Sequence, residues 1–233
     1  MKLFFRFFVD QISKIILSLS KERKVNLEKN KIIKVNIGCG LAIAEDWINI
    51  DASLNTLVST MPILFKKIFY KISGSNIYYS EKEYLDILNK NNFIHHDLSN
   101  GIPLHDESAD FIYSSHFIEH LYRDEAEILL KDCYRVLKID GTLRIILPDL
   151  SYAIEMYHSG NKDKMLQNYF FIDRKEGFFA QHKYMYDFEM FENLLLTLGF
   201  KTILKQKFKE GRCPDIEVLD NRPEESFYLE AIK

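Results

Sequence analysis

The sequence lacks the features that mark several large classes of protein. Its three cysteines are odd in number and widely spaced, which argues against a disulfide framework, and no Cys-x-x-Cys pair offers a zinc site. A net charge of −3 provides no general positive field for nucleic acid. No apolar run reaches the roughly 20 residues of a membrane span. The chain has no internal repeat, and its 47% hydrophobic and 28% charged residues are typical of a globular protein. The absence of a disulfide framework favours a reducing, cytoplasmic setting.

Charge is nevertheless unevenly distributed. Residues 1–34 carry nine Lys or Arg and three Asp or Glu, which leaves −9 for the remainder. Polar residues recur every three to four positions through residue 21, and this spacing predicts an amphipathic helix, followed by a polar connector that ends at residue 31. Such a helix packs either on the domain or a partner, or on an anionic membrane surface at the inner face of the membrane. Both interpretations remain open.

Beyond residue 31, apolar runs alternate with helical periodicity. Strands are predicted at 32–37, 47–50, 93–95, 110–114, 142–147, 200–208 and 226–232, and helices at 123–138 and 188–198. Residues 52–92 form a predicted insertion and possible lid, with helical pieces at 61–72 and 81–90. The alternation predicts an α/β doubly wound sheet in one domain, 32–233, with residues 1–31 as an appendage.

Two glycines and an acidic residue offer a nucleoside site. Gly38 and Gly40 directly follow the first strand, where glycine lets the backbone approach a ligand, and Asp51 ends the second strand, where a carboxylate can accept hydrogen bonds from ribose. There is no third glycine, and the interval from Gly40 to Asp51 is shorter than the roughly 20 residues of the dinucleotide fingerprint. NAD(P) and FAD are therefore disfavoured. A tight turn without a ligand remains an alternative for these residues alone.

A longer stretch carries a family resemblance. In order along the chain come Asp97-Leu98, Ile102-Pro103, Asp110-Phe111-Ile112, Glu119-His120-Leu121 and Arg135-Val136-Leu137-Lys138. This order and spacing resemble the class I S-adenosylmethionine-dependent methyltransferases of type 11. The pieces Val35–Gly40, Trp47–Asp51, Pro148-Asp149-Leu150 and His182–Asp187 resemble a subgroup with a short glycine loop, found in bacterial surface-polysaccharide biosynthesis.

The resemblance implies a fold, a cofactor and a set of site residues. The fold is a Rossmann-like seven-stranded sheet whose last strand is antiparallel, and the cofactor is S-adenosyl-L-methionine. Gly38, Cys39 and Gly40 would line its methionine end, while Asp51 would hold its ribose. Asp97 would bind the adenine amino group with the Leu98 backbone beside it, and Ser115 and His116 would lie beside the methyl group.

The acceptor is predicted to be an oxygen of a sugar or another small metabolite, with nucleic acid disfavoured. A hydroxyl acceptor must lose a proton, and the ionisable candidates near the strand ends are His116, Asp149 and His182. Asp149 has the alternative role of capping the helix that follows it. The Asn/Asp-Pro-Pro-Tyr/Phe motif of base-methylating relatives is replaced by Tyr113-Ser114-Ser115-His116.

Two other functions stay open. One is a non-catalytic partner protein that binds S-adenosylmethionine without methylating an acceptor. The other is a zinc hydrolase, because His116-Phe117-Ile118-Glu119-His120 fits H-x-x-E-H, in which two helical histidines bind zinc. The same residues are explained by the family's Glu-His-Leu, so no metal is expected. The oligomeric state does not follow from the sequence.

Overall fold

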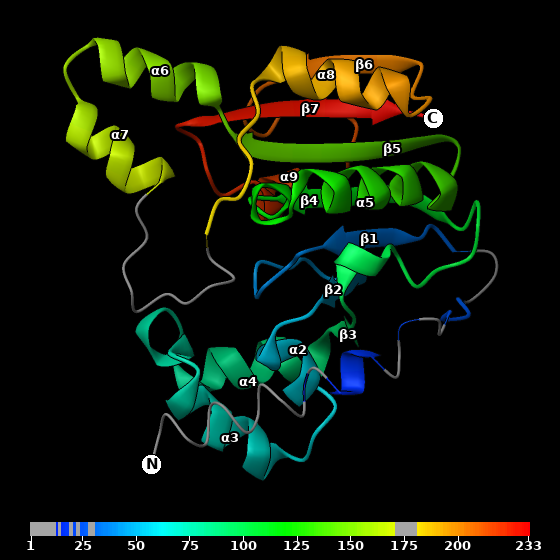
Figure 1. Cartoon of the computed structure of the whole chain (residues 1–233). Coiled ribbons are helices and arrows are strands. Elements are labelled where there is room, and N and C mark those ends of the chain that lie inside the picture. Colours follow the sequence, from blue (N-terminus) through cyan, green and yellow to red (C-terminus); the bar gives the residue numbers. More distant parts are fainter. Residues whose placement is uncertain (1–12, 14, 19–20, 22–23, 28–30, 171–180) are drawn as a thin grey trace.

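The computed structural model describes residues 13, 15–18, 21, 24–27, 31–170 and 181–233, and its centre is one seven-stranded sheet. The strands are β1 (Lys34–Ile37), β2 (Trp47–Asp51), β3 (Asn92–His95), β4 (Ala109–Ser115), β5 (Leu137–Pro148), β6 (Thr202–Gln206) and β7 (Ser226–Ile232). Their order in the sheet is β3-β2-β1-β4-β5-β7-β6 (Figure 1). The predicted doubly wound α/β sheet with an antiparallel last strand is confirmed.

The register places one end of five strands at a single edge. Strands β1 to β5 run parallel, with Asp51 opposite His95 and Ser115 opposite Ile146, whereas β7 runs antiparallel to both β5 and β6. The carboxyl ends of β1 to β5 therefore meet at the same edge, which is where open α/β sheets bind their ligands.

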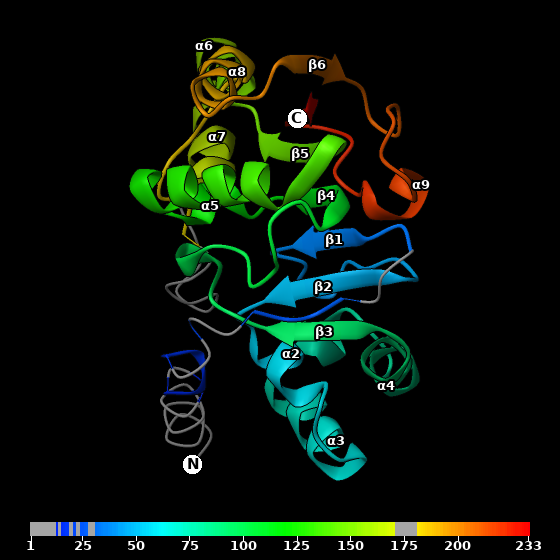
Figure 2. The ribbon, with the colours of Figure 1, turned by 90° about the vertical axis from the view of Figure 1, so that its right-hand side faces the viewer.

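Helices cover both faces of the sheet. In Figure 2, α5 (Arg123–Val136) and α8 (Phe188–Thr197) lie on one side of the sheet and α9 (Ile216–Leu219) lies on the other. The helices α2 (Leu54–Val58), α3 (Ile63–Ile72) and α4 (Glu81–Lys90) gather beside β3, and α6 (Leu150–His158) and α7 (Lys162–Tyr169) follow β5. Three short 3-10 helices complete the described elements: η1 (Ser75–Ile77), η2 (Leu98–Asn100) and η3 (Ile118–His120).

The two faces of the sheet are packed differently. The core that includes α5 is mostly aliphatic: this helix buries Leu129, Leu130 and Cys133 in a cluster whose few rings include Phe191 and Phe227. The face toward α9 contains the edge-to-face pair Trp47 and Tyr113, whose ring centroids lie 6.1 Å apart. Burial on both faces explains why the central strands read as nearly continuous apolar runs.

Several boundaries differ from those predicted. Helix α5 ends at Val136 and β5 begins at once with Leu137, so Gly141, predicted to stand beyond the helix as its stop, lies inside the strand. The short helix α2 was not predicted. Residues 38–46 contain no helix, as their small number required, and the pieces predicted at 61–72 and 81–90 are α3 and α4.

Most of the predicted N-terminal helix lies outside the described residues. Residues 15–18 are helical, and the buried Ser13 has its Oγ 3.1 Å from Nε2 of His95, at the carboxyl end of β3. This contact is of the kind expected for a segment that packs on the domain. No helix in the described part of the chain is long and apolar enough to cross a membrane.

Candidate active site

The loop after β1 is built around two left-handed glycines. Gly38 and Gly40 have φ angles of +66° and +53°, and the Gly38 N–H donates to the Ile50 carbonyl at 2.9 Å. A Cβ at Gly38 would collide with the ring of Phe117, whereas one at Gly40 would meet no atom within 4 Å. The loop therefore has a closed side, at Gly38, and an open side, at Gly40, where a ligand can approach the backbone.

Cys39 lies between these glycines but is not a nucleophile. Burial, followed by the negative charge of Asp51, raises the pKa of its thiol well above the ordinary value. The thiol is therefore protonated at neutral pH and acts as a buried apolar group.

Asp51, the last residue of β2, fixes this loop. One carboxylate oxygen accepts the Gly40 N–H at 2.9 Å, and the other accepts the Ser53 N–H at 2.6 Å. A carboxylate oxygen can accept more than one hydrogen bond, so both can still receive ribose hydroxyls. Asp51 thus shapes the loop in addition to the ligand-binding role predicted for it.

Asp97 occupies the corresponding place after β3. Its carboxylate caps η2, accepting from the Ser99 N–H at 3.1 Å and the Ser99 hydroxyl at 2.8 Å. The side chain of Leu98 is buried in the core, so it is the backbone of this residue that remains available to a ligand.

A histidine-rich cluster follows β4. Ser115 ends the strand, and His116 has a φ of +49°, which reverses the chain. Nε2 of His116 lies 2.9 Å from the Ser226 hydroxyl, and Nδ1 lies 3.6 Å from Glu119 Oε1. The same Glu119 oxygen lies 3.8 Å from Nε2 of His120.

His182 joins this cluster from a distant part of the sequence. Its ring centroid lies 5.1 Å from that of His120, in an edge-to-face arrangement. The Lys183 N–H donates to the Glu119 carbonyl at 2.7 Å, and this bond holds the segment before α8 against η3. The structure therefore brings together two of the three predicted bases, His116 and His182, around a glutamate that was not predicted as a site residue.

Burial controls protonation within the cluster. Removal from water raises the pKa of Glu119 to about 8, and it lowers the pKa of His116 to about 3 and of His182 to about 4. Burial also lowers the pKa of His120. All three imidazoles are therefore neutral at pH 7.

The third predicted base, Asp149, has a structural role. It is the N-cap of α6, where its carboxylate accepts the Ser151 N–H at 2.9 Å. Its backbone N–H donates to the Glu225 carbonyl at 2.9 Å. Of the two roles predicted for Asp149, capping is therefore the one that its side chain has in the structure.

Residues 116–120 do not form the helix that the H-x-x-E-H motif requires. His116 is left-handed and Phe117 has a φ of −130°, and only Ile118–His120 form the 3-10 helix η3. The two histidines therefore do not lie one helical turn apart. Instead, both face the carboxylate of Glu119 between them in the sequence.

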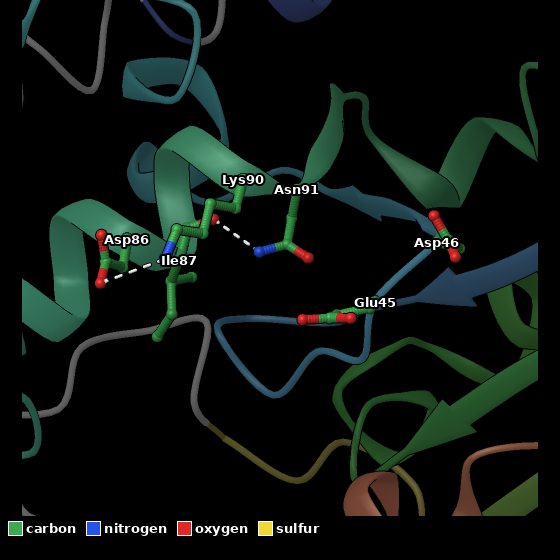
Figure 3. A pocket seen from close by; sticks show the side chains of 6 residues that line it. All are labelled: Glu45, Asp46, Asp86, Ile87, Lys90 and Asn91. Atoms are coloured by element: carbon green, nitrogen blue, oxygen red, sulfur yellow. Dashed lines mark hydrogen bonds and ion pairs between the residues drawn. The ribbon is translucent and has the colours of Figure 1, made fainter.

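A hollow of about 340 Å³ lies at the other edge of the sheet (Figure 3). Glu45 and Asp46 line it from the start of β2, and the end of α4 supplies Lys90, which pairs with Asp86 at 3.4 Å. Because ligands of such sheets bind at the carboxyl ends of the strands, this hollow is not the candidate active site.

Comparison with known proteins agrees with the topology. Residues 61–145 match the family model of a methyltransferase domain. The PH0226 protein from Pyrococcus horikoshii OT3 has 15% identity and a TM-score of 0.50, over 98% of this chain and 90% of that one. A SAM-dependent methyltransferase from Archaeoglobus fulgidus has 16% identity and a TM-score of 0.49, over 96% and 94%. None of the curated protein sequences matches the chain.

The chain has the α/β fold of the S-adenosylmethionine-dependent methyltransferases. At these identities the structural likeness concerns the fold alone. The matched methyltransferase domain implies S-adenosylmethionine as the cofactor. The geometry fits it, because the open side of the glycine loop at Gly40 lies next to the carboxylate of Asp51.

Two residues at this edge were not predicted from the sequence as part of the site. Phe117 closes the glycine loop over Gly38, and no sequence pattern signals that contact. Glu119 belongs to the family's Glu-His-Leu and to the H-x-x-E-H pattern, but neither predicted it as a residue of the methyltransferase site. Its signal was the motif itself, a carboxylate between two histidines, but its meaning required His182, which the chain brings in after α7.

Proposed function

We propose that this protein transfers the methyl group of S-adenosylmethionine to a hydroxyl oxygen of a sugar or another small metabolite, in the biosynthesis of a surface glycan. The observation that carries the proposal is the arrangement at the carboxyl edge of the sheet. The glycine loop, Asp51 and Asp97 follow β1, β2 and β3, and the His116–Glu119 cluster follows β4. In this proposal, the part of the edge formed by β1, β2 and β3 binds the nucleoside, and the part after β4 supplies the groups that accept the acceptor's proton.

The chemistry divides between the cofactor and the chain. When bound, S-adenosylmethionine supplies an electrophilic sulfonium methyl group, so the protein need only align the acceptor and remove its proton. The Asp51 carboxylate and the Gly40 backbone orient the nucleoside. In this proposal His116, whose Nε2 is 2.9 Å from the Ser226 hydroxyl, accepts the proton of the acceptor hydroxyl.

The glycan acceptor is supported by the subgroup resemblance of Pro148-Asp149-Leu150 and of His182–Asp187, and by the net charge of −3, which disfavours nucleic acid. The basic N-terminal segment would suit an enzyme whose acceptor is anchored to a membrane.

The test is a methyl-transfer assay with the full chain, radiolabelled S-adenosylmethionine and a panel of mono- and oligosaccharides. We expect S-adenosylhomocysteine to form only with an acceptor present, and we expect turnover to fall at least tenfold in His116→Ala. Cofactor binding without transfer to any acceptor would instead favour a non-catalytic partner protein.

A further inference from the structure

The cluster after β4 contains buried polar atoms that have no hydrogen-bond partner in the described part of the chain. Glu119 is buried, and neither of its carboxylate oxygens has a hydrogen-bond partner among the described residues. Nδ1 of His182 is likewise buried without a partner in that part of the chain. Burying a polar atom without a partner destabilises a fold, so three such atoms in one cluster indicate a site for a further group.

The orientation of His120 identifies what is missing. Its Nδ1 lies 3.2 Å from the Gln181 carbonyl oxygen, which can only accept, so Nδ1 carries the proton. Nε2 therefore presents a lone pair, and it lies 3.8 Å from Glu119 Oε1. Histidines that bind metals usually donate one ring N–H to a backbone carbonyl and use the other ring nitrogen as the ligand. His120 has this arrangement, with its free nitrogen on the side of Glu119.

Three such groups converge. Glu119, His120 and His182 each offer one ligand atom, and these atoms all lie within 4.8 Å of one another. Two hydrogen bonds from Lys183 hold the segments together, one from its N–H to the Glu119 carbonyl at 2.7 Å and one from its Nζ to the His120 carbonyl at 2.8 Å.

We propose that Glu119, His120 and His182 bind a divalent first-row transition metal, of which zinc is the best match. Two imidazoles with one carboxylate form a donor set typical of zinc and its neighbours, whereas magnesium and calcium prefer oxygen ligands throughout. Three protein ligands leave at least one coordination position open, as in catalytic rather than structural zinc sites.

The role of the metal rests on the proposed methyl transfer, but metal binding does not. An acceptor hydroxyl at the open position would lose its proton more readily, because a bound cation stabilises the alkoxide. The histidines would then hold the metal or orient the acceptor. The hydrolase alternative differs in its ligands, since His116 is not part of this group.

The experiment measures metal binding by the full-length protein. Metal content is determined after purification, and the chelator-treated protein is then titrated with zinc, cobalt and magnesium chlorides. We expect about one equivalent of zinc or cobalt with micromolar or tighter affinity, and much weaker binding of magnesium. Glu119→Gln, His120→Ala and His182→Ala should each weaken zinc binding at least tenfold. The exposed His158 provides the control variant, His158→Ala, which should bind zinc as the wild type does.

Two readouts keep the test decisive if a variant fails to fold. The cobalt-loaded wild type should show visible absorption bands of a nitrogen- and oxygen-ligated ion, and zinc should raise its melting temperature. Absence of both, or zinc affinity equal in all variants, would overturn the metal site. Titration with S-adenosylmethionine is run in parallel, so that loss of the metal site with intact cofactor binding is distinguishable from failure of the proposed function.

Discussion

The ring of Phe117 lies against Gly38, on the side where any other residue would carry its Cβ. The loop after β1 is thereby closed by a residue that follows β4. Because β1 and β4 are neighbours in the sheet, this contact joins the glycine loop directly to the segment that carries the histidine cluster.

This contact predicts different effects at the two glycines. Gly40→Ala meets open space and should lower the free energy of unfolding by about 1 kcal/mol, because of its left-handed backbone alone. Gly38→Ala adds a collision with Phe117 and should cost about 1–3 kcal/mol more. Chemical denaturation checks both, and Phe117→Ala should relieve part of the cost at Gly38. Equal costs at the two glycines would mean that the ring is not held in place.

Asp51 predicts a coupled loss of loop structure and cofactor affinity. Asp51→Asn leaves a single acceptor oxygen, so either the Gly40 or the Ser53 N–H loses its partner. We expect calorimetry to show affinity for S-adenosylmethionine reduced at least tenfold. The exposed Asp124→Asn, which makes the same chemical change on α5, should bind as the wild type does. Unchanged affinity in Asp51→Asn would remove this carboxylate from the cofactor site.

A buried ion network on the face toward α9 predicts a large loss of stability. Arg144 in β5 donates to Asp220 at 2.6 Å and to Glu230 at 3.3 Å, and all three side chains are buried. Arg144→Met leaves two buried carboxylates without their cation, which should cost about 3–5 kcal/mol in thermal or chemical unfolding.

Arg123→Met is the matched control for that variant. Arg123 pairs with Glu127 at 3.2 Å on the exposed surface of α5, where an ion pair contributes about 1 kcal/mol or less. If both variants lose similar stability, the network around Arg144 contributes no more than a surface pair.

We expect the burial of His96 to make the free energy of unfolding depend on pH. It is 3% exposed, and burial lowers its pKa, against the opposing effects of Asp97 and Asp132. The unfolded chain therefore takes up the proton first as the pH falls below about 6.5, and the free energy of unfolding decreases. In His96→Asn this decrease between pH 7.5 and pH 5.5 should be smaller than in the wild type.

Denaturation at the two pH values measures this difference. His105→Asn, which makes the same substitution at an exposed histidine, serves as the control variant. Parallel curves for wild type and His96→Asn would show that this imidazole takes up its proton equally in both states.

Patterns local in sequence predicted most of the fold. Apolar runs gave the strands within a few residues, and α4 and α8 lie where their periodicity placed them. The predicted boundary between α5 and β5 was wrong because Gly141 resembled a helix stop. In the structure the helix ends at Val136, and β5 begins at the next residue, Leu137.

Less of the candidate site could be predicted from the sequence, because many of its contacts join residues that are far apart along the chain. Gly38, Gly40 and Asp51 lie close together along the chain and were predicted together. The meeting of Glu119 with His182 depends on how the segment before α8 returns to η3, and the contact of Phe117 with Gly38 depends on the pairing of β1 and β4. Neither contact produces a periodic pattern in the sequence from which it could be predicted.

The position of β7 has a consequence for biosynthesis. Strand β6 joins the sheet through β7, which is inserted between β5 and β6 although it is made last of the three. During translation, residues 202–206 therefore leave the ribosome before their neighbour exists, and β5 waits with an unpaired edge. The seven-stranded sheet therefore cannot be completed until β7 has been synthesised, because β6 has no other neighbour in it.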